Sequence, residues 1–131
     1  MTTELTMLVY TAGLTLMLWV PYILAHIVNV GPVAALTYRA DATALPGWAA
    51  RAKKAHYNAI ENLAPFAALI VVAHIAGAEN QATAASAVVY FWARVGHYLL
   101  YIANVPFGRT LSFTVGWLAM LCIFWQIVFP A

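Results

Sequence analysis

The chain has little charge, a single cysteine and no basic tract, and each scarcity excludes a class of protein. Charged residues make up 8% of its 131 residues, whereas an ordinary soluble protein contains roughly 25%. So few charges cannot cover a water-soluble surface, because the apolar remainder would exceed the patches that soluble monomers tolerate. One cysteine cannot form an internal disulfide. A net charge of +2 gives nucleic acid no basic surface to bind.

Apolar residues are abundant instead, which indicates lipid as the solvent of this protein. Hydrophobic residues make up 65% of the sequence and aromatic residues 14%, with a mean hydropathy of +0.84. This composition also excludes a disordered chain. The apolar sequence that follows Glu4 continues to about Val30, which is too long for a secretory signal. We therefore expect this segment to be retained as a first membrane span.

Four apolar stretches reach the length of about 20 residues that a bilayer core about 30 Å thick requires. They are residues 5–30, 48–76, 82–104 and 111–129. Glycine and proline mark the breaks between them, and Pro106-Phe107-Gly108 is expected to form the third loop. Short connections favour antiparallel neighbours. The sequence therefore predicts one domain over residues 1–131, an all-α integral membrane protein with a four-helix transmembrane up-down bundle. Pro21 and Pro65 predict kinks inside the first two spans.

Basic residues gather on one side of the predicted spans. The first and third loops, with the helix ends beside them, hold Arg39, Arg51, Lys53, Lys54 and Arg109. The opposite side has Glu4 and Glu79 but no lysine or arginine. By the positive-inside rule, we expect the first and third loops to be cytoplasmic and both termini to lie outside.

Polar side chains form a stripe along each of the first three spans. The stripes are Tyr22, His26 and Asn29; Arg51, Lys54, Asn58 and Glu61; and Tyr90, Arg94, His97 and Tyr101. Steps of three or four residues place each stripe on one helical face. All three lie in the cytoplasmic half, with Glu61 about 20 Å along the second span. Because ionisable groups in a membrane helix mark functional sites, the pattern predicts one polar pocket open to the cytoplasm.

The charges of this predicted pocket favour an anionic ligand. Arg51, Lys54, Arg94 and Arg109 are cationic, and Glu61 alone opposes them. Arginine grips carboxylates with two hydrogen bonds, while Glu61 or Asn58 suits an ammonium or amide group. A guanidinium beside a ligand thiol would favour the reactive thiolate. His26, His97 and Glu61 lie on three different spans without metal-ligand spacing, so no metal site is predicted.

Two sequence blocks resemble the MAPEG superfamily, the membrane-associated proteins of eicosanoid and glutathione metabolism. The first block, residues 51–66, contains the pattern basic-x-x-x-Asn-x-x-Glu followed by Pro-Phe. It is carried here by Lys54, Asn58, Glu61, Pro65 and Phe66. The second block is Ala93-Arg94-Val95-x-His97-x-x-x-Tyr101, followed by Arg109. The likeness covers nearly the whole chain and is greatest to the short bacterial members.

This resemblance implies a homotrimer in a bacterial inner membrane, with glutathione bound as co-substrate between subunits on the cytoplasmic side. Glutathione would be held by Lys54, Asn58, Glu61, Arg94, His97 and Tyr101, together with the pocket cation Arg51. Arg109 would be the catalytic residue, stabilising the thiolate for attack on a hydrophobic small-molecule electrophile or peroxide. The chain departs from the family pattern at Lys54, where an arginine is usual, and at Phe113, where some members have an aromatic hydroxyl.

Three alternatives remain open at this point. Arg94 and Glu61 would form a purely structural ion pair in one of them. A second is a non-catalytic membrane protein that binds lipids or has a structural role, as in one branch of this superfamily. The third is a small transporter, against which the scarcity of polar residues in the outer half of the spans argues.

Overall fold

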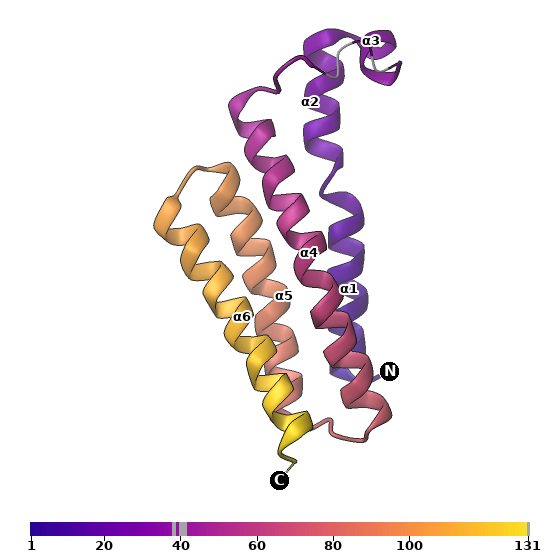
Figure 1. Ribbon diagram of the computed structural model, residues 1–131, viewed down its shortest axis with the longest axis vertical. Coiled ribbons are helices and arrows are strands. Elements are labelled where there is room, and N and C mark those ends of the chain that lie inside the picture. The colour runs from indigo at the N-terminus through magenta and orange to yellow at the C-terminus, as the bar shows by residue number, and fades with distance from the viewer. Residues whose placement is uncertain (38, 40–41, 131) are drawn as a thin grey trace.

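The computed structural model describes residues 1–37, 39 and 42–130, and within these the secondary structure is helical. The helices are α1 (Thr3–Met17), α2 (Val20–Val30), α3 (Pro32–Leu36), α4 (Gly47–Ile75), α5 (Gln81–Ile102) and α6 (Pro106–Val128). Helices α1 and α2 follow one another and pack beside α4, while α5 and α6 form a hairpin along them (Figure 1). Both chain ends lie together, far from α3 and from the α5–α6 turn (Figure 1).

Three stretches of helix are long and apolar enough to cross a membrane: Thr3–Val30, Gly47–Ile75 and Pro106–Val128. The third predicted span, residues 82–104, corresponds to α5, which has 22 residues but carries more polar side chains and is not among these three stretches. Helix α5 contacts α1, α4 and α6, so these neighbours cover its polar face. The prediction of an all-helical protein with membrane-spanning helices is therefore confirmed, with three candidate spans in the described residues.

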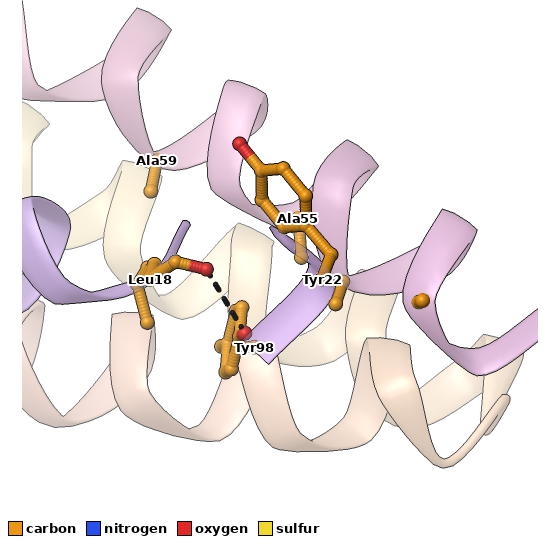
Figure 2. Packing of buried hydrophobic residues seen from close by; sticks show 7 residues of the cluster. Leu18, Tyr22, Ala55, Ala59 and Tyr98 are labelled. Atoms are coloured by element: carbon orange, nitrogen blue, oxygen red, sulfur yellow. Dashed lines mark hydrogen bonds between the residues drawn. The ribbon is translucent and has the colours of Figure 1, made fainter. Parts of the chain in front are cut away.

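The first predicted span is two helices, because the chain breaks at Leu18 and Trp19. Pro21 lacks an amide hydrogen, and its ring clashes with the carbonyl group four residues earlier. The Tyr98 hydroxyl donates a hydrogen bond to the Leu18 carbonyl oxygen at 3.2 Å (Figure 2). Ala55 and Ala59 of α4 lie across from this bond (Figure 2). The break is thus held by α5 and packed against α4.

The third loop is shorter than the sequence predicted, and the expected Pro106-Phe107-Gly108 loop is wrong. Helix α6 begins at Pro106, where a missing amide hydrogen costs nothing because the first turn has no acceptor for it. Asn104 adopts a left-handed φ of 59°. Its N–H donates to the Tyr101 carbonyl at 3.1 Å, and the next N–H donates to the Leu100 carbonyl at 3.0 Å, which is a Schellman ending. The tight turn places Arg109 in the first turn of α6.

The opposite end of the bundle is more polar than predicted. Glu4 is 3% exposed and accepts a hydrogen bond from the Thr83 hydroxyl. The Glu79 carboxylate accepts one from Thr2 at 2.7 Å and lies 3.1 Å from His74 Nδ1. Burial raises the pKa of Glu79, but the hydrogen bonds and the attraction of His74 outweigh it and hold this pKa below its ordinary value. These contacts tie the N-terminus to the α4–α5 turn.

The turn before α6 predicts a specific response to substitution at Asn104. Replacement by valine forces a β-branched residue into the left-handed region and should cost about 1–2 kcal/mol of stability. Replacement by glycine should preserve or raise stability. Thermal unfolding of the detergent-solubilised variants measures both effects, and equal unfolding temperatures for the two variants would contradict the assigned role of the turn.

Candidate functional site

Arg94 of α5 lies at the centre of the polar residues, with only 4% of its surface exposed. Its Nη2 donates to the Asn58 side-chain oxygen of α4 at 2.7 Å. The same nitrogen lies 3.4 Å from His97 Nδ1. A guanidinium has no acceptor, so in a hydrogen bond between the two groups Nδ1 of His97 is the acceptor. Arg94 thereby orients both of its neighbours.

Aromatic contacts extend this group from α5 to α6. The rings of His97 and Tyr101 meet edge to face, with their centroids 5.5 Å apart. The Arg109 guanidinium stacks over the Tyr101 ring, with its central carbon 4.7 Å from the ring centroid, a cation–π arrangement. The structure therefore brings five of the predicted site residues into one contact chain, which runs Asn58, Arg94, His97, Tyr101 and Arg109.

The local sequence explains this chain of contacts. Steps of three and four residues put Arg94, His97 and Tyr101 on one face of α5, and the short turn returns α6 along that face. Sequence reasoning missed Asn62, whose side-chain nitrogen donates to the Asn58 backbone carbonyl at 2.9 Å. The same nitrogen lies 3.4 Å from the Asn58 side-chain oxygen. Its spacing of four residues from Asn58 was the available signal.

The other residues of the α4 stripe lie differently. Arg51 Nε donates to the Ile102 carbonyl at 3.0 Å, which satisfies a free carbonyl at the end of α5. Lys54 and Glu61 are exposed on the surface of the single chain. The proposed structural pair of Arg94 with Glu61 is absent from the described residues, whose one ion pair is that of His74 with Glu79.

The polar stripe of the first span is not part of this group, so the prediction of one polar pocket is wrong for the single chain. The Tyr22 hydroxyl is 2.8 Å from His56 Nδ1 on a different face of α4. His26 lines a pocket beside Tyr22, and Asn29 lines a separate groove with Trp48. Helical spacing places residues on one face of their own helix but does not say which neighbour that face meets.

An apolar groove of about 450 Å³ lies between α4 and α6, next to the contact chain. It begins at Asn62 and continues along Pro65 and Leu69 on α4 and along Trp117 and Phe124 on α6. Apolar pockets of about 300–1,000 Å³ with a few polar groups at one end suit small hydrophobic ligands. Within the described ranges, no three His, Cys, Asp or Glu side chains are grouped to hold a metal ion.

The hydrogen bond from Arg94 makes Asn58 a stability determinant as well as a site residue. Asn58→Leu leaves the buried guanidinium without its shortest contact and should lower stability by about 1.5–3 kcal/mol, the value of a hydrogen bond to a charged group. Lys54→Leu, on the exposed face of the same helix, is the matched control and should change stability little. Equal losses in thermal unfolding would contradict the assignment.

The comparisons with known proteins identify one family. The family model described as the MAPEG family matches residues 6–129, which is nearly the whole chain. The searches of curated proteins and of solved structures found no match to this chain.

Proposed function

The chain belongs to the MAPEG family, and from this premise we propose that it is a glutathione-dependent membrane transferase or peroxidase acting on hydrophobic electrophiles. The observation that supports this most directly is the contact chain from Asn58 through the buried Arg94 to Arg109. Glutathione offers two carboxylates, one ammonium group and one thiol, which match guanidinium groups, an amide oxygen and a carboxylate.

Each residue of the proposed site has a distinct task. Arg94 and Lys54 attract the carboxylates of glutathione, and Asn58 and Glu61 accept hydrogen bonds from its amine and amides. His97 and Tyr101 line the path to Arg109. Arg51 adds positive charge through the terminal nitrogens that its contact with Ile102 does not use. Arg109 stabilises the thiolate, which is the nucleophilic form of a thiol.

We propose that this site is completed by neighbouring copies in a homotrimer. Lys54 and Glu61 are exposed in the single chain, and Glu61 lies about 20 Å along α4, deep within the bilayer. A charge that faces hydrocarbon at that depth costs several kcal/mol. A second copy that covers α4 removes this cost and turns Lys54 and Glu61 toward a shared site. Crosslinking of the protein in membranes tests the trimer directly.

The membrane arrangement suits the proposed reaction. With four transmembrane helices and the basic end of the bundle in the cytoplasm, the site receives glutathione from water. The hydrophobic electrophile partitions into lipid and enters beside α4 and α6, where the apolar groove meets Asn62. Holding both reactants together supplies the proximity that such a reaction requires. The same groove also supports a second function, that of a lipid-binding protein without turnover.

Glutathione binding is the first test of the proposal. Saturable binding to the detergent-purified protein is expected by calorimetry, and Glu61→Gln should weaken it about tenfold through loss of a charge-assisted hydrogen bond. Glu61 is exposed, so this variant should fold normally. Lys53→Gln on the same helix is the control and should bind as the parent does. Absence of binding at millimolar glutathione would overturn the glutathione site and favour the lipid-binding function.

A substitution at Arg109 tests catalysis separately from glutathione binding. Arg109→Gln should abolish conjugation of a hydrophobic electrophile but retain glutathione binding, because the lost charge acts on the thiolate. The near-ultraviolet absorbance of the bound thiolate should fall in this variant at constant pH. Unchanged turnover together with unchanged thiolate absorbance would contradict the role assigned to Arg109.

A further inference from the structure

A second polar pocket lies on a different flank of α4 from the contact chain. It has a volume of about 450 Å³ and is lined by residues of α2, α3, the end of the first loop and α4. Its polar lining comes from Tyr22, His26, Thr43 and Lys53. Lys53 precedes Asn58 by five residues, which turns the two side chains about 140° apart around the helix. The pocket is therefore separate from the proposed glutathione site.

Within the described ranges, the polar side chains that line this pocket are cationic or neutral, and neither His26 nor Lys53 has an acidic partner there. His26 Nδ1 is buried without a hydrogen-bond partner in the described part of the chain. Lys53 is exposed, and its ammonium lies 5.6 Å from the centroid of the Tyr57 ring. Among the described residues that line the pocket, none is an Asp or Glu. An unpaired buried nitrogen costs free energy, so a small rotation of the His26 ring that brings a ring nitrogen to a ligand oxygen in the pocket would be favourable.

The other residues that line the pocket are apolar, so a ligand bound there would have partly apolar surroundings. Ile23 of α2 and Leu45 of the first loop face the pocket. The pocket is lined by residues of α2, α3 and the first loop, and α3 lies at the end of the bundle away from the chain termini (Figure 1). That end is where a membrane-spanning helix meets the head groups, and lysine side chains there extend their ammonium toward the interface. An anion at this level has water on one side and hydrocarbon on the other.

We propose that this pocket binds a phosphate group, with Lys53 as its cation, Thr43 as a hydroxyl donor and His26 as a further polar contact. The geometry favours the head group of an anionic phospholipid as the source, because the apolar wall beside the phosphate suits the glycerol and upper acyl chain. A soluble phosphate ester offers the same chemistry without the chain. This inference does not depend on the proposed glutathione chemistry.

Native mass spectrometry of the full chain in detergent tests the pocket with three probes. These are phosphatidylglycerol, diacylglycerol, which has the same chains without phosphate, and sn-glycerol 3-phosphate, which has phosphate without chains. Phosphatidylglycerol should bind saturably and diacylglycerol should not. Lys53→Gln should weaken phosphatidylglycerol binding about fivefold, the effect of one lysine near an anionic lipid. Lys53→Arg should restore the affinity.

Neighbouring positions supply the controls. Lys54→Gln removes the same charge from the adjacent residue, about 100° around the helix, and should leave phosphatidylglycerol binding unchanged. Thr43→Val lies in the loop outside the helices and should weaken binding without affecting folding. His26→Phe keeps an aromatic ring but removes both nitrogens, and it should weaken binding as well.

The outcomes distinguish a lipid head group from a soluble phosphate ester as the ligand. They also distinguish failure of the phosphate pocket from failure of the proposed glutathione function. Competition by glycerol 3-phosphate at concentrations equal to the lipid would support the phosphate site and assign it to soluble esters. Equal losses in Lys53→Gln and Lys54→Gln, or equal binding of diacylglycerol and phosphatidylglycerol, would overturn it. Lys53-dependent lipid binding in a protein that does not bind glutathione would support the pocket while the proposed function alone fails.

Discussion

The burial of one guanidinium between α4 and α5 is the constraint on which the candidate site depends. Arg94 is 4% exposed, and burying an ionised guanidinium is costly unless its donors are paired. Its Nη2 has partners, whereas its Nε is buried without a hydrogen-bond partner in the described part of the chain. Asn58 supplies a neutral oxygen at 2.7 Å, so the positive charge is oriented but not neutralised. A carboxylate partner in the same chain would have cancelled that charge. The arrangement therefore leaves a positive charge at the candidate site, which is what the proposed anionic ligand requires.

The helix ends position the other residues of the candidate site relative to Arg94. Asn104 reverses the chain in a three-residue turn, so α6 starts close enough for the Arg109 guanidinium to stack on Tyr101. At the other side of α5, the Tyr98 hydroxyl holds the break between α1 and α2 through the Leu18 carbonyl. The turn at Asn104 and the hydrogen bond from Tyr98 both give partners to backbone groups that hydrocarbon would otherwise leave unpaired. The same features that make the bundle stable in lipid thus also position the site.

Much of this arrangement could be predicted from helical periodicity, and the failures have a common cause. Spacing correctly placed Arg94, His97 and Tyr101 on one face because that face is a property of a single helix. Spacing did not predict that Tyr22 meets His56 on another flank of α4, because the rotation of one helix relative to its neighbour is set by packing. The start of α6 at Pro106 was missed because proline occurs both in loops and at the first helical position.

Helix α4 carries the features from which we propose that neighbouring copies complete the site. Its small buried residues, such as Ala52, Ala55 and Ala59, let α2 and α5 approach closely, so the larger polar side chains are displaced to its outer flanks. Asn58 lies at one edge of the buried face and is paired with Arg94, whereas Glu61, three residues later, is exposed. Water can solvate such a carboxylate in detergent, but hydrocarbon cannot. In the proposed trimer, a second copy of the chain, or a ligand held by one, would be the partner of this exposed carboxylate in the membrane.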